Sequence, residues 1–359
     1  MGRLVYKYRF FFWGLLLNGI GLLTLYSALN YKGKVVYEML LAKQIIWALI
    51  AWVVFWVTAS IDYHYWKGVV AVSYVLSILL LILVLVIGDV RYGARRWMSI
   101  GGFVFQPSEL AKVSFVLTIS YILSIPRKIN IKWLIIGIIL TLFPAILIAM
   151  EPDLGTSLTL VPIAVAVFLS SGLSWRWIVL GVFSGVASMP IAWHFLKDYQ
   201  KQRILVFLNP TKDPLGAGYT VVQSRIAIGS GGFWGKGWLS GTQNKFNFLP
   251  ERHTDFIFSV LAEEWGLVGS ILIIFAFASL VSNTLALALN CRDRFARHLS
   301  VAIGTYFFIH AFINIAMTCG FLPVVGLPLP FMSYGGTSLL MSYFLLGILQ
   351  SIARDVDKI

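Results

Sequence analysis

The sequence predicts an all-α polytopic membrane protein, and three observations lead to this prediction. The 359 residues are 59% hydrophobic and only 12% charged, which is more apolar sequence than a single water-soluble core can bury. The mean hydropathy is correspondingly high, at +0.84. The apolar residues also gather in runs long enough to cross a bilayer as helices.

About ten such transmembrane helices are expected within one domain that covers residues 1–359. The chain starts with three basic residues before position 10, and the apolar run that follows is too long for a removable signal peptide, so we interpret it as the first span. The apolar windows lie at roughly 10–30, 44–60, 68–88, 108–125, 133–150, 156–171, 175–195, 256–289, 299–321 and 335–353.

An even number of spans places both termini on the same side of the membrane. The short segments on the side of the termini carry thirteen Lys and Arg residues, and those on the other side carry seven. By the positive-inside rule, both termini are cytoplasmic. The large loop at about 196–255, between the seventh and eighth spans, is then extracytoplasmic.

This loop carries eight Lys and Arg residues against four Asp and Glu residues. A positive loop beside the headgroups can attract a phosphorylated lipid, and a solvated loop with an incidental excess of charge remains the alternative. The formal net charge of the whole chain is +13, but its basic residues are spread over the loops, without a basic helix or a zinc pattern. We therefore expect membrane lipids as partners and no nucleic acid.

A glycine-rich stretch at 229–237 resembles a phosphate-binding loop only superficially. Ser230 stands where a Walker A motif needs glycine, and Gly237 stands where it needs Ser or Thr. This disfavours ATP-driven transport. The glycines predict tight turns at the membrane interface, with aromatic anchors at Phe233, Trp234 and Trp238.

Several acidic residues fall within or beside the apolar windows. Glu109 and Lys112 share one helix face in the fourth window, so they form either a functional pair near the outer mouth or a structural ion pair. Glu263 and Glu264 lie inside the eighth window, where they are either functional or paired with Arg or backbone donors within the bundle. Asp255 directly precedes this window, and it is either a catalytic acid or the N-cap of the helix.

Two further stretches are expected at the outer end of the bundle. Glu151 and Asp153 lie in a very short turn, where Asp153 either caps the next helix or has a function. The stretch 320–338 contains three prolines and four glycines, which cannot continue a helix. Irregular backbone at membrane depth needs protein or a cavity around it, so this stretch is expected to line the same outer site.

Three of these stretches together resemble the SEDS family (shape, elongation, division, sporulation) of bacterial cell-wall proteins, and most closely its elongation branch. They are Gly241–Phe258, Gln106–Lys112 and Pro323–Ser338. With the ten-span topology, the resemblance covers essentially the whole chain. One departure is Phe321, where the family usually has an aliphatic residue.

The resemblance implies a peptidoglycan glycosyltransferase in the bacterial inner membrane that polymerises lipid II during cell-wall elongation and rod-shape maintenance. It also implies a class B penicillin-binding protein, a transpeptidase, as partner. Asp255 is then the essential acid and the expected general base. The residues expected to contact the substrate are Glu109, Lys112, Lys245, Arg252 and Ser333.

The leaving pyrophosphate of such a reaction needs positive charge, from these basic residues or from a divalent cation such as Mg or Mn. Asp153 and Glu151 are the candidate ligands for such a cation. Two alternative functions stay open at this point. The intramembrane charges could form a path for the headgroup in a lipid II flippase, or the chain could be a non-catalytic scaffold for cell-wall enzymes.

Overall fold

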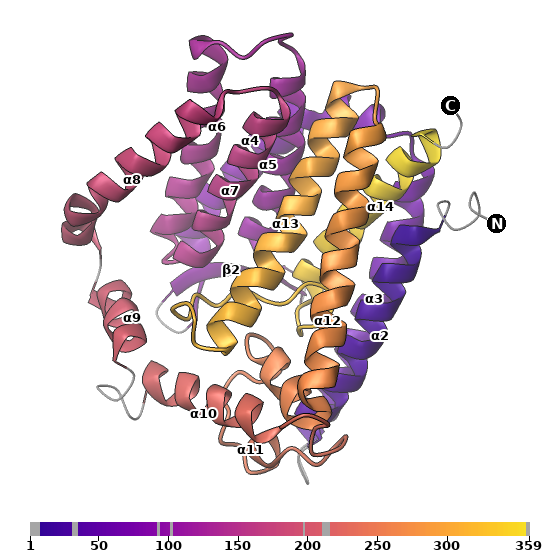
Figure 1. Ribbon diagram of the computed structural model, residues 1–359, viewed down its shortest axis with the longest axis vertical. Helices are drawn as coiled ribbons and strands as arrows, with labels where there is room; N and C mark the ends of the chain where they lie inside the picture. Colours follow the sequence, from indigo (N-terminus) through magenta and orange to yellow (C-terminus); the bar gives the residue numbers. More distant parts are fainter. Residues whose placement is uncertain are drawn as a thin grey trace.

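The computed structural model describes residues 8–30, 35–91, 94–100, 103–196, 198–209 and 216–356 (Figure 1). Among these residues, ten long helices coincide with the ten predicted windows. They are α2 (Arg9–Leu29), α3 (Val35–Ser60), α4 (Tyr65–Ile87), α5 (Pro107–Ser124), α6 (Ile131–Met150), α7 (Leu154–Ser170), α8 (Trp175–Phe195), α12 (Ile257–Asn290), α13 (Arg294–Thr318) and α14 (Gly336–Val356). The predicted polytopic helical fold is confirmed.

Seven of these helices are long and apolar enough to cross a membrane by length and composition, counted over the described residues. The helix α4 has 23 residues, which corresponds to about 35 Å at 1.5 Å per residue. The helix α7 is shorter, with 17 residues, and α5 carries the buried Glu109 and Lys112. Polar side chains inside a membrane bundle belong on its interior helices, which is where α5 lies.

The interior of the bundle is formed by α5, α13 and α14. The helix α13 packs against α12, α7 and α5, and α14 packs along α3. The outer helices α3 and α4 instead expose many large apolar side chains, as lipid-facing helices do. The polar residues that the interior helices carry are therefore shielded from lipid.

The helix α8 stands apart from the bundle (Figure 1). Most of its described side chains are exposed, and no other described helix packs along it. An exposed helix with many large apolar side chains needs an apolar environment, and for α8 we expect this environment to be lipid. It leads into the segment between the seventh and eighth spans, which forms three further helices, α9 (Asp198–Leu208), α10 (Ala217–Ser230) and α11 (Thr242–Lys245).

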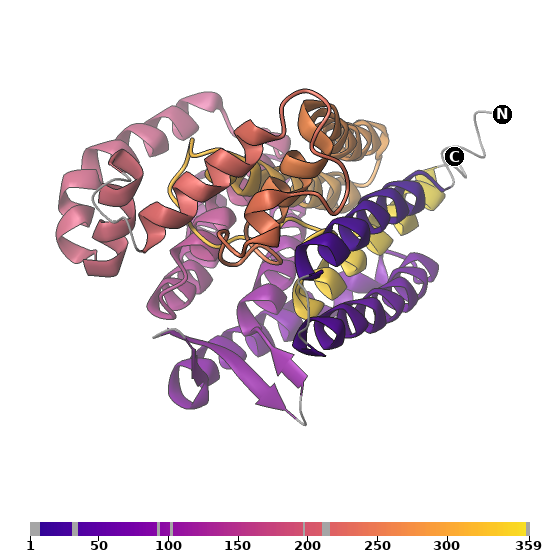
Figure 2. The same cartoon turned by 90° about the horizontal axis from the view of Figure 1, so that it is seen from below.

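A small antiparallel sheet precedes α5, and the sequence analysis did not predict it. Its strands are β1 (Asp89–Arg91), β2 (Ala94–Ile100) and β3 (Phe103–Phe105), in the order β1-β2-β3. In the register, Asp89 pairs with Trp97 and Met98 pairs with Phe105. Seen from below the bundle, the sheet lies at the edge of the molecule, and α10 and α11 lie across the same end (Figure 2).

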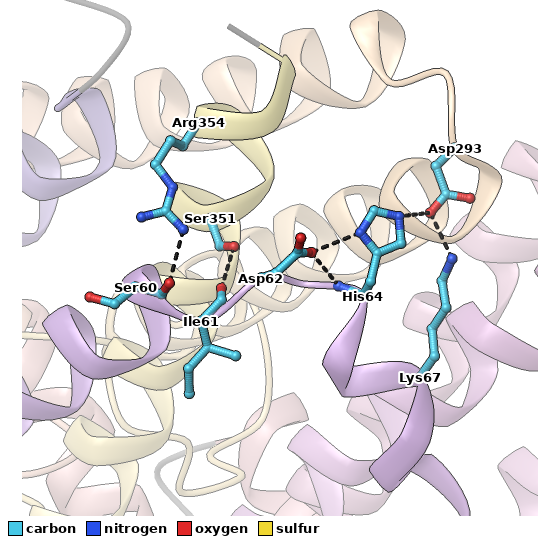
Figure 3. Close-up of polar contacts among 8 residues, drawn as sticks. All are labelled: Ser60, Ile61, Asp62, His64, Lys67, Asp293, Ser351 and Arg354. Carbon is cyan, nitrogen blue, oxygen red and sulfur yellow. Dashed lines mark hydrogen bonds and ion pairs between the residues drawn. The ribbon is translucent and has the colours of Figure 1, made fainter. Parts of the chain in front are cut away.

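At the opposite end of the bundle, a group of polar contacts joins helix termini, including the C-terminal end of α14 (Figure 3). Lys67 forms an ion pair with Asp293 at 3.0 Å, and Asp62 contacts the ring of His64 at 2.7 Å. Arg354 donates a hydrogen bond to the Ser60 carbonyl at 3.0 Å. These contacts join the starts and ends of α3, α4, α13 and α14, so the ends of neighbouring helices meet as the topology predicts.

Candidate functional site

Asp255 lies at the end of a run of turns that leads into α12, and its side chain is half-buried. The N-cap of α12 is Phe256, and no side chain caps this helix end. The capping alternative for Asp255 is therefore wrong. Asn314 of α13 fixes the backbone here, because its side-chain amide donates to the carbonyls of Asp255 at 2.9 Å and Leu327 at 2.7 Å.

The proline-rich loop between α13 and α14 lies against Asp255. The Ser333 hydroxyl donates to the Thr254 carbonyl at 2.6 Å, and the Tyr334 N–H donates to the His253 carbonyl at 2.8 Å. Gly326 has a φ of +76°, and a Cβ atom at this position would lie 3.4 Å from Asp255 Oδ2. The predicted approach of this loop to the acid is confirmed, and Ser333 acts on the backbone next to Asp255.

Four charged groups surround the Asp255 carboxyl group closely enough to influence its pKa. Burial raises the pKa most, and the nearby Glu251 and Asp153 raise it further. Arg203 and Arg96 oppose these effects, and the resulting pKa is about 7. At neutral pH the group is thus divided between its protonated and its carboxylate form.

Arg96 and Arg203 come from segments that the sequence analysis treated only as carriers of loop charge. Arg96 is on β2 and donates to the Glu151 carbonyl at 3.0 Å and to the Pro152 carbonyl. Arg203 is on α9 and donates to the Val324 carbonyl at 3.2 Å. The only sequence signal for them was an arginine in an outer segment, which does not indicate that the fold brings both towards Asp255.

Glu109 and Lys112 form the predicted pair, and both side chains are buried near the start of α5. The Lys112 ammonium lies 2.8 Å from Glu109 Oε1 and 3.3 Å from His310 Nε2, and it sits over the ring of Tyr306. The Lys112 and Glu109 side chains are 0% and 3% exposed. The contacts of Lys112 are therefore with protein groups from α5 and α13.

Two other basic residues predicted to contact the substrate have different surroundings. Lys245 is exposed at the end of α11. Arg252 is buried, and its guanidinium donates to the Ala28 carbonyl at the end of α2 and to the Asn247 side chain. Arg252 therefore ties the segment before Asp255 to α2.

Neither acidic residue of the turn between α6 and α7 has the surroundings of a ready metal ligand. Asp153 is the N-cap of α7, since it accepts from the Thr156 N–H at 3.2 Å and from its hydroxyl at 2.9 Å. Glu151 is fully buried, and burial together with Asp153 raises its pKa to about 9. No group of three His, Cys, Asp or Glu side chains among the described residues could hold a metal ion. Within the part of the chain that the structure describes, the side chains of this turn thus form no ready cation site, and cation binding by Asp153 and Glu151 stays a prediction.

Glu263 and Glu264 are bound to protein groups within the bundle, although the ion-pair partner is a lysine and not the expected arginine. Glu263 forms an ion pair with Lys236 at 2.7 Å. Glu264 accepts from the Ser27 hydroxyl. Glu263 therefore ties the glycine-rich stretch to α12, and Glu264 ties α2 to α12.

The site has the elements of an acid–base centre for an anionic substrate. A carboxyl group with a pKa near 7 can take up a proton near neutral pH. Guanidinium groups recognise phosphate oxygens through pairs of N–H donors, and each carries five donors. Together they can deprotonate a hydroxyl group and stabilise a departing phosphate.

Comparisons of the sequence with known proteins agree with the motifs. The model of the family described as "Cell cycle protein", which groups FtsW, RodA and SpoVE, matches residues 8–358. The chain is 40% identical to the peptidoglycan glycosyltransferase MrdB of Escherichia coli K12 over 92% of each chain. It is 37% identical to a probable peptidoglycan glycosyltransferase FtsW of Geobacter sp. M18 over 94% of each chain.

Solved structures agree with the fold. A chain from a peptidoglycan synthase complex, described as coordinating polymerization and crosslinking, aligns with a TM-score of 0.83 and 32% identity over 97% of this chain and 98% of that chain. The crystal structure of the rod shape determining protein RodA of Thermus thermophilus aligns with a TM-score of 0.73 and 29% identity over 97% and 96% of the two chains. The chain belongs to the FtsW/RodA/SpoVE family, as its three motifs predict.

Proposed function

We propose that this chain is a peptidoglycan glycosyltransferase that polymerises lipid II, with Asp255 as the general base. The observation that carries the proposal is the position of Asp255, which is half-buried at the start of α12, has a pKa of about 7, and lies near two arginines. The peptidoglycan glycosyltransferases MrdB and FtsW, to which the chain is similar, support the class of reaction.

The chemistry requires one proton transfer. A hydroxyl group of the acceptor sugar attacks the anomeric carbon of the donor, and the C–O bond to the lipid pyrophosphate breaks. The hydroxyl proton passes to the Asp255 carboxylate, which must therefore be ionised before the step. The surrounding loops fix the backbone of Asp255 and the neighbouring Thr254, so that the carboxylate does not have to be ordered during the reaction.

The leaving pyrophosphate develops negative charge, and we assign its stabilisation to Arg203 and Arg96. Both lie near enough to lower the pKa of Asp255, so the positive charge of both reaches the space around its carboxyl group, where the pyrophosphate would leave. Lys245 is exposed and is a candidate for a further contact. The substrate contacts expected for Glu109, Lys112, Arg252 and Ser333 stay predictions.

The isoprenoid part of such a substrate needs an apolar surface that is continuous with the membrane. The exposed apolar side chains of α8 provide this surface, and α8 leads directly into α9, which carries Arg203. A lipid lying along α8 would therefore present its pyrophosphate at the level of α9.

The proposal includes a location and a partner. We place both termini on the cytoplasmic side of the bacterial inner membrane and Asp255 at the opposite, extracytoplasmic face, because basic residues are more frequent on the side of the termini. A class B penicillin-binding protein is the proposed partner, by analogy with the peptidoglycan synthase complex that the fold resembles.

A polymerisation assay on the purified chain tests this function. Lipid II is supplied without any other transglycosylase, and the products are separated by size. Glycan strands are the expected result. Transfer of lipid II across a vesicle bilayer without glycan formation would instead support a flippase, and neither activity would support a scaffold.

A further inference from the structure

The helix α12 is broken at Gly266. This residue has a φ of 66° and a ψ of −158°, a region that only glycine adopts readily. In an unbroken helix, the N–H groups of Leu267 and Val268 would donate to the carbonyls of Glu263 and Glu264. The break separates a short first part, residues 257–265, from the long remainder of the helix. We call this first part the half-helix.

The glycine-rich stretch fills the break, and we call residues 231–243 the wedge. Its backbone bonds to the groups that the break leaves unpaired. Two wedge N–H groups donate to α12: Lys236 to the Glu263 carbonyl and Gly237 to the Glu264 carbonyl, both at 3.0 Å. Two α12 N–H groups donate to the wedge: Leu267 to the Gly232 carbonyl at 3.0 Å and Val268 to the Phe233 carbonyl at 3.3 Å. Two helical hydrogen bonds are thus exchanged for four bonds to the wedge. Buried backbone groups need such partners, above all at membrane depth.

The fit leaves no room for side chains at three glycines. A Cβ atom on Gly235 would lie 2.1 Å from the Glu264 carbonyl oxygen, and one on Gly266 would lie 2.3 Å from the Gly235 nitrogen. A Cβ atom on Gly231 would lie 2.1 Å from the Ala262 carbonyl oxygen. Nearby Gly229, in α10, has nothing within 4 Å of its Cβ position. The sequence thus contains glycine at the three positions where a Cβ atom would collide with the facing backbone.

The buried carboxylate of Glu263 binds the wedge to the half-helix, and we call its ion pair with Lys236 the latch. Glu263 Oε1 lies 2.7 Å from Lys236 Nζ, and it accepts from the Thr242 hydroxyl at 3.0 Å and the Gln243 N–H at 3.1 Å. The Glu263 side chain is 1% exposed. One carboxylate oxygen therefore gathers three donors from the wedge.

We propose that the wedge is a positioning device, which holds α12 open at Gly266 and thereby sets the place of the half-helix and of Asp255. This inference rests on the proposed role of Asp255. Nine residues are too few to form a stable helix alone, so the half-helix depends on what it is bonded to. The wedge supplies its C-terminal partners, while Asn314 and Ser333 hold the segment at its N-terminal end.

Glycine substitutions test the fit of the wedge. Gly235→Ala and Gly266→Ala should speed hydrogen exchange at the amides of Lys236, Gly237, Leu267 and Val268. They should also lower kcat for lipid II polymerisation at least about tenfold, with KM within about twofold. Gly229→Ala is the matched control and should leave exchange and kcat unchanged.

Latch substitutions test the same idea without changing the backbone. Lys236→Met removes the ion pair and should lower kcat in the same way, and Lys236→Arg should restore most of it. If an alanine variant fails to fold, Lys236→Met and Lys236→Arg still test whether the wedge positions Asp255. Faster exchange in the wedge with a wild-type kcat would overturn the proposal, and so would unchanged exchange in Lys236→Met. Inactive wild-type protein, or active Asp255→Asn protein, would instead count against the proposed function.

Discussion

Asp255 and Asp293 precede two consecutive helices, α12 and α13, at opposite ends of the bundle, and their surroundings differ. Asp293 caps its helix by accepting from the Phe295 N–H, and it forms an ion pair with Lys67 (Figure 3). Its side chain is 32% exposed. Asp255 does not cap its helix, and burial and a neighbouring acid raise its pKa to about 7.

The Asp293 carboxylate stabilises the fold, whereas the fold holds the Asp255 carboxylate in surroundings that suit a reaction. Asp293 contacts Lys67 and the Phe295 N–H, and its side chain is partly open to water. The surroundings of Asp255 disfavour its charged form, so a proton can be gained or lost near neutral pH. Perturbed acids of this kind gather at functional sites, and each prediction below tests whether the contrast between the two ends is real.

The largest effect is expected from Asp255→Asn. Removing a general base should lower the polymerisation rate by a factor of about 10² to 10⁴, with little change in melting temperature. Asp255→Ala should do the same without the roughly 1 kcal/mol loss of a helix cap, because no cap exists here. The matched control is Asp293→Asn, which should retain activity within twofold. Near-normal glycan synthesis by Asp255→Asn would reject Asp255 as the base and make Glu251 the next candidate.

The next largest effect concerns the buried pair of Glu109 and Lys112. Removing one partner leaves an unpaired charge in the bundle, which should cost about 3–5 kcal/mol of stability or a comparable loss of activity. The double variant Glu109→Gln/Lys112→Met should lose less than the sum of the two single losses. A double-mutant cycle on folding and activity measures this coupling, and additive effects would rule the pair out as one unit.

The arginines near Asp255 come next. Arg203→Met should lower kcat/KM about 10- to 100-fold, the effect of one charge-assisted hydrogen bond to a phosphate. Arg354→Met, at the other end of the bundle, removes the same charge and should change kcat/KM less than twofold. Equal effects of the two substitutions would mean that net charge, and not the position of Arg203, matters.

These arginines also mark the limit of what the sequence predicts. The ten helices were predictable because apolar runs of membrane length have few other structures open to them. Asp255 and the buried pair were predictable because charged residues are rare in or beside such runs. Arg96 and Arg203 were not, since their role depends on the unpredicted strand β2 and on the path of α9.

The break in α12 was also beyond the sequence analysis. The predicted window at 256–289 continues past Gly266, and a single glycine within a helical pattern does not by itself predict a break. The glycines of the wedge predicted turns correctly, with positive φ at Gly232, Gly235 and Gly237. That these glycines pack against α12 around Gly266 can be seen only in the tertiary structure.

The pH dependence of kcat should reflect the raised pKa of Asp255. A base must be ionised, so activity should rise with pH, with a midpoint near 7 and about a tenfold gain between pH 6 and pH 8. Glu251 raises this pKa, and Glu251→Gln should therefore move the midpoint to lower pH. Arg203 lowers it, so the residual activity of Arg203→Met should have a midpoint at higher pH. Midpoints that do not move would show that another group sets the profile.

The smallest effect is expected at the end of the bundle that holds the chain termini. Lys67 and Asp293 are each about one third exposed, so water and salt screen their ion pair. Lys67→Met should lower the free energy of unfolding by about 1 kcal/mol or less, and the difference should shrink further in high salt. Activity should stay within twofold of wild type, whereas Lys112→Met should lose far more. A large loss of activity in Lys67→Met, with the protein still folded, would mean that the two ends are coupled.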